Sequence, residues 1–171
     1  MEEIIRVGKS ADVPEAVGAI SLCPHKGCAF KCCDFQRTGA ILLYPGEIEA
    51  ALAESKSVTH LEILDPNYHG GMRVKCRALD TGSCDQGYKP LDCASYPLFP
   101  VLLPECDAAL DLSLIVKDSI CPIHSSEISY HGRFVIETWR RLVSRNAAVK
   151  SWLRSIYPGN VRPDDTDFIQ L

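Results

Sequence analysis

Cysteine side chains are the feature of this sequence with the clearest chemistry. The chain has 171 residues and nine cysteines, and eight of these fall into an N-terminal cluster, a middle run and one later position. Thiolates are soft ligands that favour zinc, copper(I) or an iron–sulfur cluster over magnesium or calcium. Thiolates separated by two to four residues also reach one ion without the entropy cost of closing a long loop. We predict metal ligands at Cys23, Cys28, Cys32, Cys33, Cys76, Cys84, Cys93 and Cys121.

The spacing leaves the number of metal centres open. Four cysteines suffice for one zinc ion or one iron–sulfur cluster, so eight could hold two centres. Cys32 and Cys33 are adjacent, and neighbouring side chains of an extended chain point apart. Either they serve two centres, or one of them lies beside the metal or is a reactive thiol. Cys106 has no ligand spacing around it, and we interpret it as a small buried apolar residue.

The redox environment decides how so many thiols are used. The first residues, 1–6, are acidic and lack an apolar run, so no secretory signal is predicted and the expected location is the cytoplasm. Disulfides are rare in that reducing compartment, where clustered cysteines more often bind metal or do redox chemistry. Complete disulfide pairing would also leave one thiol over, because the number of cysteines is odd.

The segment around the middle cysteines carries further residues of a recognisable pattern. This segment carries Cys76, Leu79, Gly82, Cys84, Pro90, Cys93, Tyr96 and Pro97. Together with an N-terminal cluster that ends in Cys32-Cys33, these residues make the chain resemble the YkgJ-like family of cysteine-cluster proteins, which chelate zinc or iron. The resemblance covers residues 23–122, and Cys121 matches the late cysteine of that family.

The resemblance implies zinc or iron chelation. Some relatives resemble iron–sulfur enzymes, including flagellin lysine methylases, which adds an enzymatic alternative by analogy. The first cluster is wider than the usual spacing of the family, so either Cys23 or His25 fills the first ligand position. His124, close to the last cysteine, is a further alternative ligand. Lys89 and Ala94 stand where the family usually has arginine.

These observations give two main function hypotheses and a third. The first is a metal-binding protein in which zinc or iron, the latter in an iron–sulfur cluster, has a structural or carrier role. The alternative is an iron–sulfur enzyme in redox or methyl-transfer chemistry, so whether the chain is an enzyme stays open. The third is a metal-free thiol enzyme, in which Lys31 beside Cys32 and Cys33 would lower a thiol pKa.

Short regular elements are expected to position the cysteines. Helical spacing of apolar residues, with a proline and acidic residues at the start, predicts a helix over residues 46–56. Alternation predicts strands over 58–64 and 110–116, and residues 73–76 are expected to form a strand that runs into a ligand. The segment 77–100 is punctuated by glycine and proline, which favours an ordered loop.

The C-terminal part has a helical pattern. Apolar residues, Trp139 and Trp152 among them, recur every three or four positions over residues 131–157. This predicts a core-facing stripe on one long helix, or on two helices with a break near Asn146. The expected fold class is α+β, a single small loop-rich domain over residues 1–171. It would be built around cysteine–metal centres, with helices at its C-terminal end.

Composition limits the expected partners of the protein. Apolar residues make up 46 % of the chain and charged residues 23 %, as in ordinary soluble proteins, and no apolar run is long enough for a membrane helix. The net charge of −4 gives no general reason to expect nucleic acid. The C-terminal helical region is basic, either as a solvated face or as a docking surface for an acidic protein partner. Its charged residues are Arg133, Arg140, Arg141, Arg145, Lys150 and Arg154, against Glu137.

Overall fold

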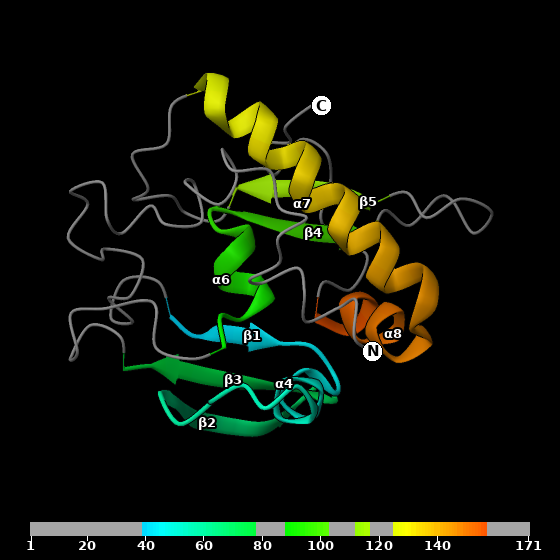
Figure 1. The fold of residues 1–171 in the computed structure, drawn as a ribbon. Helices are drawn as coiled ribbons and strands as arrows, with labels where there is room; N and C mark the ends of the chain where they lie inside the picture. The colour runs from blue at the N-terminus through cyan, green and yellow to red at the C-terminus, as the bar shows by residue number, and fades with distance from the viewer. Residues whose placement is uncertain (1–38, 78–87, 103–111, 117–124, 157–171) are drawn as a thin grey trace. The chain divides into compact units, whose positions relative to one another are not determined.

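The computed structural model describes residues 39–77, 88–102, 112–116 and 125–156. These residues fall into two compact units. The first contains the described residues up to Ala94, and the second contains those from Ser95 onward. Each unit combines helical residues with an antiparallel sheet, so the predicted mixture of α and β structure is confirmed (Figure 1). A single domain organised around metal centres stays a prediction.

A three-stranded antiparallel sheet is the framework of the first unit. Its strands are β1 (Ile41–Leu43), β2 (Leu61–Tyr68) and β3 (Gly71–Cys76), and β3 is paired with both of the others. Figure 1 shows β3 in the middle, with β1 and β2 at the two edges. One apolar cluster of this unit consists of the buried side chains Ile41, Leu43, Leu61 and Val74.

A tight hairpin joins β2 to β3. Tyr68 is paired with Gly71, which leaves His69 and Gly70 as the turn, with φ angles of 55° and 91°. Two successive positive φ angles suit the twist of antiparallel strands, and glycine adopts such an angle without a Cβ penalty. With so short a turn, β3 begins at Gly71, two residues before the strand predicted over 73–76.

Strand β2 is irregular in its middle. The pairing register with β3 shifts on both sides of Asp65. Pro66 comes next, and it has no N–H to give to a ladder hydrogen bond, while Asn67 donates its N–H to Asp65 Oδ1 at 2.9 Å. The strand predicted over 58–64 therefore begins later, at Leu61, and continues to Tyr68 with an irregular register around Asp65.

Helix α4 (Glu47–Ala53) confirms the predicted helix, and a left-handed residue follows its C-cap Glu54. Ser55 has a φ angle of 57° and donates its N–H to Leu52 O at 2.9 Å. The next N–H, that of Lys56, donates to Ala51 O, also at 2.9 Å. This pair of bonds is a Schellman motif, which satisfies carbonyl groups that the helix end would leave open. A motif of this kind usually has glycine at the position that Ser55 occupies.

The second unit is a strand pair covered by two helices. Strands β4 (Leu98–Leu102) and β5 (Leu112–Val116) are antiparallel. Helix α7 (Ser125–Arg145) packs against both strands, and α8 (Ala147–Ile156) packs against α7 and β4. The strand predicted over 110–116 is confirmed by β5.

The prediction of a loop over residues 77–100 is wrong in its second half. Helix α6 (Leu91–Ser95) and most of β4 lie there. Pro90 precedes the first residue of α6, where a missing N–H does no harm, and Pro100 lies in β4, which among the described strands is paired with β5 alone. The prolines therefore mark a helix start and an edge strand rather than a loop.

Asn146 produces the break between the two C-terminal helices. Its side-chain oxygen accepts the N–H groups of Ala148 at 3.1 Å and Val149 at 3.3 Å, which makes it the N-cap of α8. The sequence left one long helix or two helices open, and the structure has two, with the break at Asn146. Trp139 and Trp152 are both buried, as their place on the apolar stripe predicts.

Within the described ranges, the structure contains no helix that combines the length and the apolar character needed to cross a membrane.

The Schellman motif leads to a stability prediction. Changing Ser55→Gly should raise the free energy of unfolding by up to about 1 kcal/mol, because a left-handed conformation costs a residue with a Cβ roughly that amount. Urea unfolding measures the change. The matched control is Ser57→Gly, which removes a hydroxyl bonded to Thr59 at a position without positive φ and should lower stability. An equal loss in both variants would contradict this interpretation of Ser55.

Candidate functional site

Two of the predicted metal ligands lie in the described part of the chain, and both belong to the first unit. Cys76 is the last residue of β3, and Cys93 lies in the middle of α6. Both side chains are half-buried thiols that pack against the same apolar cluster. The remaining cysteines are outside the described residues, namely Cys23, Cys28, Cys32, Cys33, Cys84, Cys106 and Cys121.

The described residues do not by themselves form a complete metal site. Across residues 39–77, 88–102, 112–116 and 125–156, no group of three or more His, Cys, Asp or Glu side chains is placed to hold an ion. A tetrahedral site needs more ligands than two thiols. His25 and His124 lie outside the described residues, so the alternative ligands are not placed either.

The sheet gives Cys76 its place. It is paired with Leu61 of β2, and it comes two residues after Val74, so the two side chains of β3 are on the same face of the sheet. Val74 is fully buried in the apolar cluster. The end of β3 therefore carries the Cys76 thiol to the edge of that cluster.

Two buried carboxylates hold the helix that carries Cys93. Asp92, in the first turn of α6, accepts the N–H of Leu42 of β1 at 2.8 Å. Glu47, the first residue of α4, accepts the N–H of Leu91 at 2.8 Å. A helix of five residues is too short to be stable on its own, so contacts such as these must fix its position.

Glu47 is fully buried and accepts hydrogen bonds from two further donors. Its Oε1 atom also accepts the hydroxyl of Tyr88 at 2.7 Å, and its Oε2 atom accepts the N–H of Tyr44 at 3.0 Å. Burial raises the pKa of the Glu47 carboxyl to about 7, although these hydrogen bonds oppose the rise. Burial and the neighbouring Glu47 charge also raise the pKa of the Tyr88 hydroxyl well above its usual value.

The sequence patterns did not indicate the roles of Glu47, Tyr88 and Asp92. The positive end of the helix dipole explains acidic residues at the start of α4, and this is a local effect. Two of the donors to Glu47, the Tyr88 hydroxyl and the Leu91 N–H, are more than forty residues away along the chain. An acidic residue on the apolar face of a predicted helix is the signal that would have indicated a buried role.

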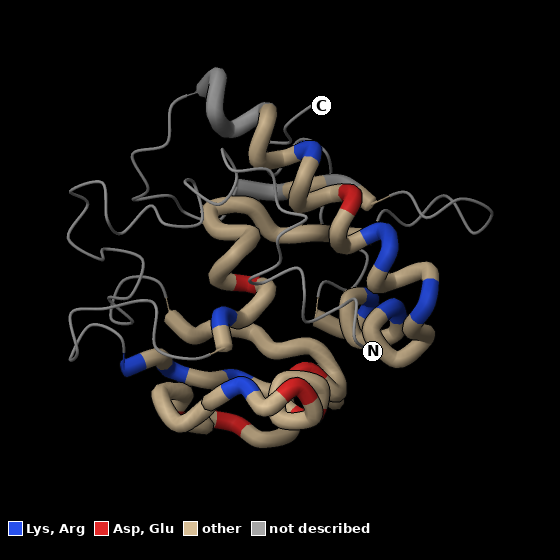
Figure 2. The backbone as a smooth tube through the Cα atoms, in the orientation of Figure 1, with Lys and Arg blue, Asp and Glu red and all other residues tan. Residues whose placement is uncertain are grey.

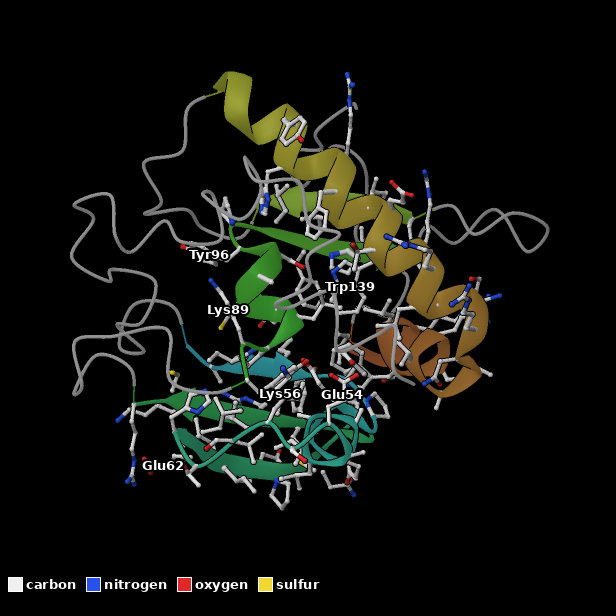
Figure 3. The ribbon with its side chains drawn as sticks, viewed as in Figure 1. Glu54, Lys56, Glu62, Lys89, Tyr96 and Trp139 are labelled. Atoms are coloured by element: carbon white, nitrogen blue, oxygen red, sulfur yellow. The ribbon has the colours of Figure 1, made fainter. Side chains whose placement is uncertain are left out.

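A second polar contact lies in the second unit and centres on Ser95. The Trp139 indole N–H donates to Ser95 Oγ at 2.9 Å, and His131 Nε2 lies 3.0 Å from the Ser95 carbonyl oxygen, to which it donates. His131 is fully buried, and Trp139 points from α7 toward β4, where its ring centroid is 5.9 Å from that of Phe99 (Figure 3). These contacts fit a structural role for His131.

The segment that carries the family resemblance is described only in part. Pro90 immediately precedes α6, Cys93 lies in the middle of it, and a cis peptide bond joins Tyr96 to Pro97 after it. Of the other matching positions, Cys76 ends β3, whereas Leu79, Gly82 and Cys84 are outside the described residues.

The basic residues predicted near the C-terminus lie along α7 and α8, as Figure 2 shows. All of them are exposed apart from Lys150, which is half-buried. Such exposure is required of a docking surface and is also found in any solvated helix face. An acidic protein partner therefore stays a prediction.

Comparisons of this chain with protein-family models, with curated proteins and with solved structures find no match. The resemblance to the YkgJ-like family therefore stays a prediction.

The buried carboxyl of Glu47 leads to a prediction about pH. Above its ordinary pKa of 4.5 the unfolded chain releases this proton, whereas the folded chain keeps it until about pH 7. The free energy of unfolding should therefore fall as the pH rises from 4.5 to about 7, and the total decrease should be about 3 kcal/mol. Glu47→Gln should remove this fall. Urea unfolding of both proteins at several pH values measures the difference, and parallel curves would contradict the prediction.

Proposed function

We propose that this protein binds zinc or iron, the iron as an iron–sulfur cluster, through clustered cysteine thiolates. The observation that carries the proposal is the convergence of Cys76 and Cys93. They come from a strand and a helix, yet they pack against one apolar cluster. Both are thiols, the form from which a ligating thiolate is made.

The surroundings of the two thiols support a soft metal rather than a hard one. Magnesium and calcium take oxygen ligands, chiefly carboxylates and carbonyls. The buried carboxylates described in this unit, Glu47 and Asp92, accept hydrogen bonds from backbone N–H groups instead. Sulfur therefore remains the natural donor beside the apolar cluster, and thiolates favour zinc and iron–sulfur centres.

The rest of the ligand set is proposed from the sequence. Two thiolates leave a zinc ion or a cluster incompletely coordinated. Further ligands would come from Cys23, Cys28, Cys32, Cys33, Cys84 and Cys121. A reducing cytoplasm, the location we propose, would keep all of these thiols available for a metal.

The magnitude of metal binding bears on its role. Structural zinc contributes roughly 10–16 kcal/mol of apparent binding free energy in small peptides. The stability of a whole domain is only about 5–15 kcal/mol. If the metal is structural, its removal by a chelator should therefore unfold the cysteine-bearing unit. An iron–sulfur cluster would instead supply electron transfer or substrate activation at the same thiolates.

The proposal predicts that Cys93→Ala loses metal and stability together. The wild-type protein and the variant are purified anaerobically, their metal contents are measured, and thermal unfolding is followed in both. Cys106→Ala is the matched control, because Cys106 lacks ligand spacing and its loss should leave the metal content unchanged. Full metal occupancy in Cys93→Ala would overturn the proposal.

The absorption spectrum of the same wild-type sample distinguishes the two metals. Brown protein with broad absorption near about 400 nm would support an iron–sulfur cluster. Colourless protein with stoichiometric zinc would support a zinc centre. Wild-type protein that takes up neither metal would refute both.

A further inference from the structure

The chain that leads into α6 is fixed at two points by one oxygen atom. Glu47 Oε1 accepts the Tyr88 hydroxyl at 2.7 Å and the Leu91 N–H at 2.8 Å. Between these residues, Pro90 restricts the backbone further because its ring fixes φ. The N–H of Ala94 then donates to Pro90 O at 2.9 Å and closes the first turn of the helix.

The other oxygen of Glu47 fixes the carboxylate itself. Glu47 Oε2 accepts the N–H of Tyr44, in the turn that precedes α4. The carboxylate therefore connects the start of α4 to the start of α6, and both oxygens have donors within hydrogen-bond distance. Three donors therefore hold the carboxyl group of Glu47 in one orientation.

A buried carboxylate is not the simplest way to fill space in a core. An apolar side chain of similar volume would avoid the cost of removing a carboxyl group from water. What only an oxygen acceptor supplies here is a partner for the Leu91 N–H, two residues before Cys93. The side chain is therefore placed where it controls the start of the ligand-bearing helix.

We infer that Glu47 is a positioning residue for Cys93, holding α6 so that the Cys93 thiol lies beside the apolar cluster in an orientation ready to ligate. This inference rests on the proposed function for its metal-binding consequence. The first part of the inference, that Glu47 holds the Cys93 thiol in place, can be tested without metal. Groups that orient a metal ligand typically change metal affinity by about 10- to 100-fold when they are removed.

The test compares two substitutions of Glu47 in the reduced, metal-free full-length protein. Glu47→Leu removes both acceptors, whereas Glu47→Gln keeps an oxygen that accepts the donors from Tyr88 and Leu91. Iodoacetamide labels the thiols, and mass spectrometry of peptides gives the rates for Cys93 and Cys76. In Glu47→Leu the rate at Cys93 relative to Cys76 should rise about tenfold, as local opening of α6 exposes the thiol. Glu47→Gln should keep the wild-type ratio.

Cys76 is the internal control for a general loss of structure. It packs against the same apolar cluster but lies on β3, so unfolding of the unit would accelerate both thiols equally. Glu49→Leu is the matched control on α4, because Glu49 is exposed and its substitution should leave the ratio unchanged. Equal acceleration of the two thiols, or an unchanged ratio in Glu47→Leu, would overturn the inference.

A titration with Co²⁺ then tests the link to metal. Absorption from thiolate-bound Co²⁺ should require about 10- to 100-fold more metal in Glu47→Leu than in wild type, and Glu47→Gln should restore it. Wild-type protein without thiolate–Co²⁺ absorption would count against the proposed function, while the labelling ratio would still decide the positioning role.

If circular dichroism shows that Glu47→Leu is not folded, Tyr88→Phe replaces it. This change removes one donor to Glu47 and leaves the other two. The relative labelling of Cys93 should then rise about threefold, and an unchanged ratio would overturn the inference.

Discussion

The first unit depends on one carboxylate that is held away from water. Glu47 joins the turn after β1 to the segment that begins α6, through donors from Tyr44, Tyr88 and Leu91. Loss of that acceptor would leave buried donors without a partner, which costs more than the net value of the bonds themselves. The position of the Cys93 helix is therefore a consequence of long-range polar contacts, in addition to apolar packing.

Local sequence signals were sufficient to predict the elements that have a repeated apolar pattern or a capping residue next to them in the sequence. The apolar stripe of α7 and α8 repeats over several turns, and the side chain of Asn146 caps the N–H groups two and three residues later, so the break could be predicted. Helix α6 and strand β4 were missed because prolines dominate their surroundings. Whether a proline ends an element or begins one depends on neighbours that the sequence does not place.

The candidate site likewise has a part that the sequence predicted and a part that it did not. Cysteine spacing indicated Cys76 and Cys93 as ligands, and the structure brings both to one apolar cluster, while the other predicted ligands lie outside the described residues. The part played by Glu47 could not be predicted, since the donors from Tyr88 and Leu91 come from more than forty positions away. Glutamate at a helix start is ordinarily explained by the dipole, and only burial reveals a second role.

The polar contacts around β1 have a further effect on association between molecules. Leu42 lies in the middle of β1 and Tyr44 directly follows the strand, and the N–H groups of both are bound by side-chain carboxyl groups. Asp92 takes the first and Glu47 the second. An exposed row of such donors invites an extra strand from another chain, which is a common beginning of aggregation. Here two carboxyl groups already accept N–H groups that an incoming strand would need along β1, which disfavours lateral growth there.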